Sequence, residues 1–211
     1  MAYAPDVFYQ GVSAEDVAQR GRNGIEVWAQ RGIAGRGVLL DVARAMAAAG
    51  RPFDPGSSTA LTVEDLELAR AEAGVEFRPG DVVLVRTGFV GWYRTQDDRT
   101  RQAMARGRLT AAGLEHTEAM ARYVWDSGAA AFASDAPALE VWPPDPRPEA
   151  APFGFLHNVL IGQFGLAIGE LWELDALAED CAADGRYEFL LTSAPLHVPG
   201  GIGSPANALA I

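Results

Sequence analysis

The stretch RPGDVVLVRTGF, residues 78–89, decides the fold class. It opens with a Pro-Gly turn, continues as a run of β-branched residues and leucine, and ends at the polar pair Arg86-Thr87. A short apolar run that is bounded by a turn signal is typical of a buried strand. The polar end matters because functional sites in α/β proteins gather at strand ends.

The same pattern occurs on both sides of this stretch. Residues 35–43, GRGVLLDVA, are a glycine turn and a short buried strand that ends at Asp41, and residues 129–137, AAAFASDAP, form a third such strand that reaches Asp135. A long strand is predicted over residues 186–196. Several of the predicted strands therefore end at a polar side chain.

Helices are predicted between these strands. Ser13 and Thr62 each begin a capping-box pattern, and Gly74 is a helix stop. Helical patterns cover about residues 13–20, 62–74, 97–107, 114–126 and 174–185, and a further helix begins near Phe155 before a short strand at 166–168. Because strands and helices alternate, the fold class is α/β, and residues 1–211 are expected to form a single domain.

Composition excludes several classes of protein. The 211 residues are 49% apolar and 21% charged, which is typical of a globular protein with a substantial core. The net charge of −11 and the lack of basic clusters argue against nucleic-acid binding. A single cysteine, Cys181, fits a reducing compartment, and the cytoplasm is expected because we find no secretory signal and no membrane-length apolar run.

One histidine lies in an apolar stretch and raises a question of function. His157 is found in FGFLHNVLIGQFGLAIGELWELDAL, residues 153–177, and Glu170 follows it thirteen residues later. Either His157 is a core histidine with both nitrogens satisfied, or it is half of a site. Zn²⁺ and Mn²⁺ both accept imidazole and carboxylate ligands. Spacing alone favours the core histidine.

Other polar residues allow two interpretations each. His197 follows a buried strand and precedes a glycine loop, so it is a candidate for a pocket rim, whereas His116 is expected to be exposed. Arg86 either anchors an anionic substrate or pairs with a carboxylate. Asp135, like Asp41, is either a turn residue or a ligand.

Taken together, GRGVLLDVAR, RPGDVVLVRTGF, AFASDAPALEVWPP and the segment from His157 to Ala210 resemble the cyclase family. These are the kynurenine formamidase-like, or arylformamidase-like, metal-dependent hydrolases, here in their longer bacterial branch. The resemblance runs from about residue 7 to residue 211. It implies a swivelling β/β/α fold that assembles as a homodimer or homotetramer. It also implies cleavage of a formamide, cyclic amide or lactone with a divalent metal, commonly Zn²⁺ or Mn²⁺, and an arylformamidase-like activity belongs to tryptophan catabolism.

The resemblance also implies roles for individual residues. His157 and Glu170 match two metal ligands of the family. His157 and His197 are the candidate catalytic histidines; His197 lies outside the family's ligand pattern but could reach in from the C-terminal loop as a third ligand. The positions of Arg86 and Asp135 at strand ends, rather than the resemblance, make them the candidate contacts to a small-molecule substrate. We expect His157 to be buried and within reach of Glu170.

The family's defining motif is a histidine followed by Gly-Thr-His-x-Asp, and it supplies most of the metal ligands. It normally lies just before the segment that resembles VFYQGVSAEDV, residues 7–17, and the three histidines of this chain cannot rebuild it. We therefore expect an N-terminally truncated member of the family with an incomplete metal site and little or no activity. The alternative is a non-catalytic small-molecule-binding or assembly subunit that kept the fold.

Overall fold

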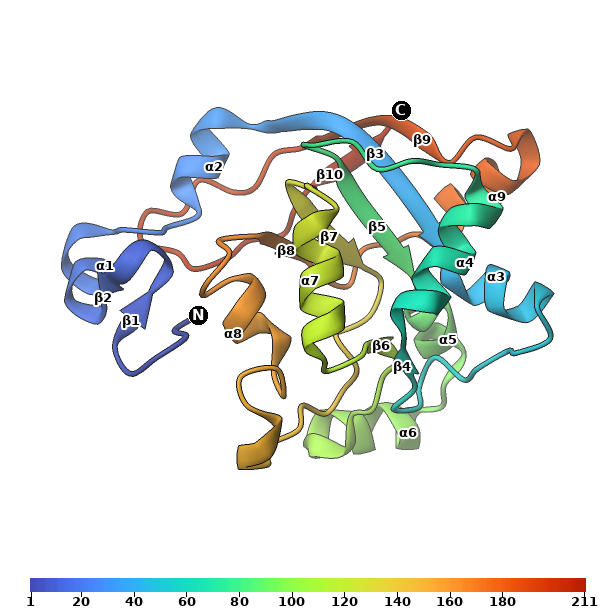
Figure 1. The fold of residues 1–211 in the computed structure, drawn as a ribbon, viewed down its shortest axis with the longest axis horizontal. Coiled ribbons are helices and arrows are strands. Elements are labelled where there is room, and N and C mark those ends of the chain that lie inside the picture. Colours follow the sequence, from blue (N-terminus) through green and yellow to red (C-terminus); the bar gives the residue numbers. More distant parts are fainter.

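A computed structural model describes residues 1–211, the side chain of Arg20 excepted. Its centre is a six-stranded sheet with the strand order β10-β9-β3-β5-β7-β8, and helices cover both faces of it (Figure 1). The strands are β3 (Ile33–Asp41), β5 (Val82–Arg86), β7 (Ala131–Ser134), β8 (Ala167–Gly169), β9 (Glu188–Ser193) and β10 (Ala208–Ala210). Strands β3, β5, β7 and β8 run parallel, whereas β9 is antiparallel to β3 and β10 is antiparallel to β9.

Two short strand pairs lie outside this sheet. Strand β1 (Val7–Phe8) pairs with β2 (Val12–Ser13), and β4 (Ala60–Leu61) pairs with β6 (Gly113–Leu114). The α-helices are α1 (Ala14–Arg20), α2 (Glu26–Arg31), α3 (Val42–Ala48), α4 (Val63–Ala73), α5 (Phe89–Thr95), α6 (Asp98–Ala103), α7 (Glu118–Asp126), α8 (Leu156–Leu160) and α9 (Asp175–Asp184). The fold is the mixed α/β class that the sequence predicts.

Capping explains where two of the helices begin. Ser13 forms a capping box with Asp16 at the start of α1, and Thr62 forms one with Asp65 at the start of α4. In the second box the Asp65 carboxylate accepts from the Thr62 amide at 3.0 Å. Gly74 ends α4 in the left-handed conformation. These helix boundaries confirm the sequence predictions and follow from local chemistry.

The parallel strands are buried on both faces, and alternate residues face opposite layers. On one face Val83 and Phe132 pack with side chains of α3, α4, α7 and α8, such as Leu66 of α4. On the other face Leu84 packs against α9, which contributes Cys181. Cys181 is therefore a core residue, as the sequence indicates.

The helix and strand boundaries predicted from the sequence are wrong where pairing with a distant strand determines the structure. The helix expected from residue 114 begins at Glu118 instead, because Gly113–Leu114 is taken into β6 and the Thr117 side chain accepts from the Met120 amide. Residues Ala208–Ala210, for which no strand is predicted, form β10 against β9. Across the described chain no helix has the length and hydrophobicity needed to cross a membrane.

Replacement of Phe132 by alanine is expected to lower the free energy of unfolding by about 3–5 kcal/mol, the usual cost of a large cavity in a core. Phe132 is 0% exposed and lies in the central sheet. The matched control is Val27→Ala on α2, whose side chain is 57% exposed, and we expect a change within about 0.5 kcal/mol. Urea denaturation measures both. Similar losses from the two variants would contradict this description of the core.

Candidate metal site

Polar side chains line one edge of the parallel part of the sheet. Asp41 ends β3, Arg86 ends β5, Asp135 follows β7 and Glu170 follows β8. Because these four strands run parallel, their carboxyl ends meet at the same edge. This is the edge at which sites are found in α/β proteins.

His157 and Glu170 come together at this edge. His157 is the second residue of α8 and is 9% exposed, and its Nε2 lies 3.0 Å from Glu170 Oε1. The ring of Phe155 stacks on the imidazole, with the two ring centres 4.7 Å apart and the planes 10° from parallel. His157 is thus buried and within reach of Glu170, as expected. Its role as a metal ligand stays a prediction.

A second carboxylate, Glu140, holds the other side of the imidazole. Nδ1 of His157 lies 2.7 and 2.8 Å from the two carboxyl oxygens of Glu140, and the His157 amide donates to Oε1 at 3.2 Å. Glu140 is 0% exposed. Sequence reasoning missed this residue. Its only signal is a single carboxylate inside the apolar run ALEVW, residues 138–142.

The two carboxylates set the charge of the ring in the metal-free chain. Burial acts to lower the pKa of His157, but hydrogen bonds and charges from Glu140 and Glu170 outweigh it and raise the pKa from 6.5 to about 9. At neutral pH the imidazole is therefore a cation shared by two carboxylates. A metal at Nε2 would have to replace the proton on that nitrogen.

The donors at this site fit two positions of a Zn²⁺ or Mn²⁺ site. Nε2 of His157 and Oε1 of Glu170 lie 3.0 Å apart, and both ions accept nitrogen and oxygen ligands. Among the side chains that the structure describes, no group of three or more His, Cys, Asp or Glu residues is placed to hold a metal. The pair therefore contributes two ligands.

The other two histidines lie elsewhere. His197 is exposed, and its Nε2 lies 3.1 Å from the side-chain amide nitrogen of Gln30 on α2. It does not join His157 and Glu170, so a third ligand from His197 finds no support in the described geometry. His116 is half-buried rather than exposed, and its Nε2 is buried without a hydrogen-bond partner among the described residues.

Arg86 is engaged by carboxylates of its own chain. Its guanidinium lies 2.8 Å from Asp41 Oδ1 and 2.8 Å from Asp175 Oδ1. Burial opposes the charge, but the two carboxylates raise the pKa of Arg86 overall. Of the two interpretations of Arg86, pairing with carboxylates is the one seen here. Binding of a substrate by Arg86 stays a prediction.

Asp135 ties the ends of two strands together. Its Oδ1 accepts from the Thr87 amide at 2.7 Å and from the Thr87 hydroxyl at 2.8 Å, and its Oδ2 accepts from the Gly88 amide at 2.7 Å. Gly88 has a φ of 84°, which favours glycine. Burial raises the pKa of Asp135 against these hydrogen bonds. The geometry is that of a turn residue, and its role as a substrate contact stays a prediction.

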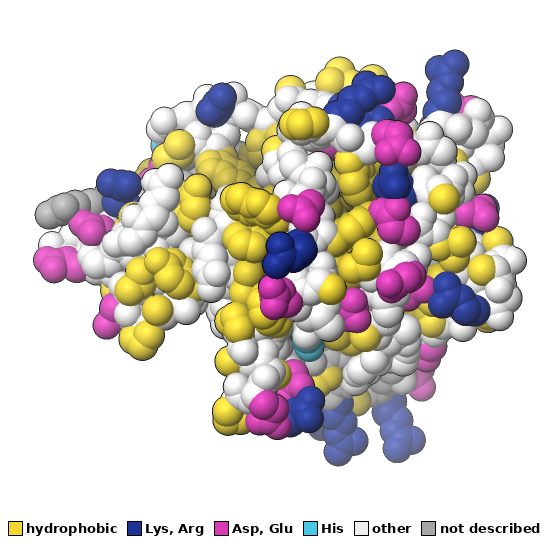
Figure 2. All heavy atoms as spheres, in the orientation of Figure 1, with side chains coloured by type: hydrophobic (Ala, Val, Ile, Leu, Met, Phe, Trp, Pro, Cys, Tyr) yellow, Lys and Arg dark blue, Asp and Glu magenta, His cyan; other side chains and the backbone are white. Residues whose placement is uncertain are grey.

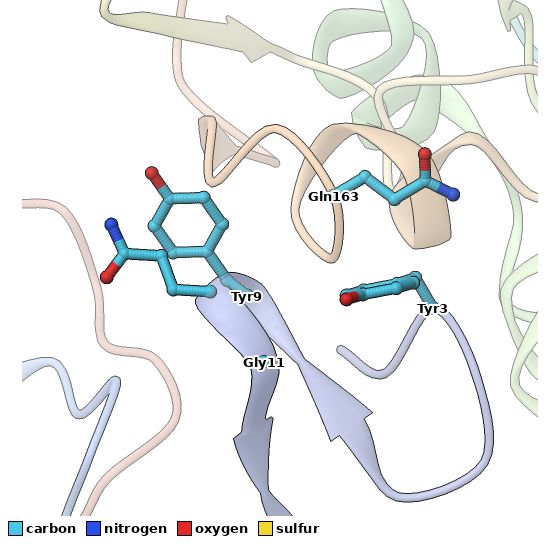
Figure 3. Close-up of a pocket in the computed structure, with 5 residues that line it drawn as sticks. Tyr3, Tyr9, Gly11 and Gln163 are labelled. Atoms are coloured by element: carbon cyan, nitrogen blue, oxygen red, sulfur yellow. The ribbon is translucent and has the colours of Figure 1, made fainter.

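Two hollows lie away from the His157–Glu170 pair. One, of about 590 Å³, is lined by Tyr3, Tyr9, Gln10, Gly11 and Gln163, and Tyr3 and Gln163 lie across it from Tyr9 (Figure 3). The other, of about 300 Å³, lies between the end of α7 and the segment before β8, beside the rings of Trp125 and Phe164, whose planes are tilted 56° to one another. Neither hollow is lined by His157 or Glu170, so the candidate metal site is inferred from the distance between these two side chains and not from a cavity.

The surface carries no sign of a nucleic-acid interface on the face shown in Figure 2. Acidic and basic side chains lie mixed across its middle, where α7 and α4 are, and no basic stripe is formed. This distribution agrees with the net charge of −11. A phosphate backbone requires clustered lysine or arginine side chains.

Comparison with known proteins shows which family the chain belongs to. The Cyclase family model, described as "Putative cyclase", matches residues 9–141. The chain belongs to this family, which confirms the resemblance seen in the sequence. A crystal structure of a novel cyclase is 33% identical, with a TM-score of 0.78, and the match covers 99% of this chain and 65% of that one. The chain thus spans less than two thirds of the length of that relative.

Two isatin hydrolases share the fold at lower identity. Isatin hydrolase A from Labrenzia aggregata, bound to benzyl benzoate, is 18% identical with a TM-score of 0.60, and the match covers 92% of this chain and 67% of that one. An isatin hydrolase bound to the product analogue thioisatinate is 21% identical with a TM-score of 0.56, over 86% of this chain and 61% of that one. No curated protein matches the chain.

The metal-free chain is expected to lose stability as the pH rises through the pKa of His157. The folded ring binds its proton more tightly than the unfolded ring, so this contribution is complete below 6.5 and is lost as pH rises through about 9. The loss is on the order of 3 kcal/mol. Urea denaturation between pH 6 and pH 10 in the presence of a chelator measures it.

The control for this measurement is His157→Gln, which carries no titrating ring. This variant should lack the decline in the unfolding free energy over the same pH range. Parallel curves for the wild type and the variant would show that His157 does not carry the pH dependence.

Proposed function

We propose that this chain carries part of the active site of a metal-dependent hydrolase. The reaction is the addition of water to a carbonyl of a formamide, a cyclic amide or a lactone. The observation that carries the proposal is the pair of His157 Nε2 and Glu170 Oε1, 3.0 Å apart at the carboxyl ends of parallel strands. Membership of the cyclase family supports it, and so do two structural neighbours named isatin hydrolases, because isatin is a cyclic amide.

The residues of this chain would hold the metal ion and leave one side of it open to the substrate. A bound Zn²⁺ or Mn²⁺ would polarise the carbonyl and lower the pKa of bound water to about 7. His157 and Glu170 would hold the ion. The Glu170 side chain is 34% exposed and that of Glu140 is 0% exposed, so substrate and water would approach from the Glu170 side.

Two ligands imply a weak site. Catalytic zinc sites usually hold the ion with three protein groups and leave one position for water. The described residues offer His157 and Glu170. We therefore propose that the chain alone binds metal weakly and turns over slowly. The alternative is the non-catalytic binding or assembly subunit.

Zinc binding followed by calorimetry, together with hydrolysis of isatin, N-formylkynurenine and a lactone panel, tests the proposal. Binding is expected to be weak, to disappear in His157→Ala and to weaken further in Glu170→Gln, because the first change removes one of two ligands and the second removes the charge of the other. The matched control is His197→Ala, which removes an exposed histidine and should change nothing. Any turnover should follow the same pattern among the variants.

Two results would count against this function. Turnover that survives in His157→Ala would place the chemistry elsewhere. Tight binding of a substrate analogue without zinc binding and without turnover would favour the non-catalytic subunit.

Association into a homodimer or homotetramer stays part of the proposal. The edge strand β10 pairs with β9 on one side only, and Leu190, Leu209 and Ile211 are 51, 63 and 74% exposed there. An apolar sheet edge of this kind favours pairing with another copy. Light scattering at micromolar concentration should report a dimer or larger, and Leu209→Lys should shift it toward the monomer. A wild-type monomer would contradict the expectation.

A further inference from the structure

We propose that Glu140 is a positioning residue that fixes the tautomer and the orientation of His157, so that Nε2 faces Glu170 and the metal. The metal in this statement rests on the proposed function, whereas the orientation of the ring does not. Glu140 would touch neither the metal nor the substrate. It would act through His157 alone.

The contacts of Glu140 select one nitrogen of the ring. Both of its carboxyl oxygens lie within 2.8 Å of His157 Nδ1, and Oε1 also accepts from the His157 amide at 3.2 Å. Among the described residues no other group is hydrogen-bonded to this carboxylate. An ionised carboxylate only accepts hydrogen bonds, so in the cationic ring Nδ1 carries a proton toward Glu140 and Nε2 carries the other. When the ring loses one proton, the contact of Nδ1 with both oxygens of the buried Glu140 retains the proton there and leaves the lone pair on Nε2, 3.0 Å from Glu170 Oε1.

The backbone around Glu140 is held in place, which makes it a firm support. The Leu114 amide donates to the Leu139 carbonyl at 3.0 Å, and the Val141 amide donates to the Leu114 carbonyl at 2.9 Å. Gly113 packs directly against Glu140, because a Cβ at Gly113 would lie 2.4 Å from the Glu140 carbonyl carbon. The backbone that carries the carboxylate is therefore held in place on both sides of Glu140.

Phe155 restricts the remaining motion of the ring. Phe155 stacks on the imidazole with the ring centres 4.7 Å apart, and this contact limits tilting of the ring. The orientation of the ring within its own plane is then set by the hydrogen bonds of its nitrogens. Glu140 is hydrogen-bonded to Nδ1 and Glu170 lies beside Nε2, and the two carboxylates differ in burial. The fully buried carboxylate can only orient the ring, whereas the partly exposed one can also face an ion and solvent.

A merely structural role is the alternative. In that case Glu140 anchors the start of α8 and is indifferent to which nitrogen of His157 carries the proton. The two roles differ in a spectroscopic observable. ¹⁵N chemical shifts of the imidazole, recorded on the metal-free protein at a pH where the ring is neutral, report which nitrogen is protonated.

The experiment compares the wild type with Glu140→Gln, Glu140→Asp and the control Glu115→Gln, which makes the same change of charge on the neighbouring segment. We expect the wild-type ring to carry its proton on Nδ1. Glu140→Gln should give a mixture of tautomers, because an amide both donates and accepts. Glu140→Asp should restore the Nδ1–H form in part, and Glu115→Gln should match the wild type.

Zinc titration, followed at the His157 resonances, gives the second readout. Glu140→Gln should weaken zinc binding about 10–100-fold, the usual effect of removing the hydrogen-bond partner of a ligating histidine. A wild-type ring protonated on Nε2, or a Glu140→Gln ring with the wild-type tautomer, would overturn the proposal even if zinc binds at His157. If zinc leaves wild-type His157 unchanged while the Nδ1–H form is present, the metal site fails and the orienting role of Glu140 stands. If both Glu140 variants fail to fold, the wild-type tautomer decides.

Discussion

The carboxyl group of Glu140 is fully buried, and this constrains much of the region around it. A buried charge without a partner costs several kcal/mol, so the chain must supply donors to it. His157 supplies them from both its amide and its ring, which fixes where α8 begins and how the imidazole is turned. The position of Nε2 against Glu170 is a consequence of that pairing. One buried carboxylate thus connects the segment after β7, the start of α8 and the end of β8.

The parallel direction of the strands determines the position of Glu170. Because β7 and β8 are parallel neighbours, the residues that follow them emerge at the same edge. Glu170 follows β8 directly, and the Leu171 and Trp172 amides donate to the carbonyls of Ala136, just after β7, and Ser134, its last residue. The site is thus assembled from backbone hydrogen bonds that the sheet requires in any case. This agrees with the recurrence of the fold in relatives of 18–21% identity.

Local chemistry made a large part of the fold predictable from the sequence. The buried strands around residues 35–43, 78–89 and 129–137 and the capping boxes at Ser13 and Thr62 depend on neighbours a few residues away, and each was recognisable. Pairings between distant segments were not. No strand was predicted at β10, and the helix expected from residue 114 lost its first residues to a pairing with a strand more than fifty residues away. The proximity of His157 and Glu170 was predicted from the resemblance to a family. The contact between Glu140 and His157 was not predicted, because the residues next to a glutamate in an apolar run do not indicate which distant side chain it contacts.

The hydrogen bonds of Asp135 have a consequence for motion. The amides of Thr87 and Gly88 follow the end of β5 in a turn, yet both donate to a carboxylate that is 1% exposed and attached to the end of β7. Amides in turns usually exchange with solvent through small local openings, whereas amides that depend on the core exchange only through larger ones. The amides of Thr87 and Gly88, which follow Arg86, should therefore exchange their hydrogens as slowly as those of the central strands. This edge of the candidate site would then belong to the same cooperative unit as the sheet, and flexibility would remain on the side of Glu170.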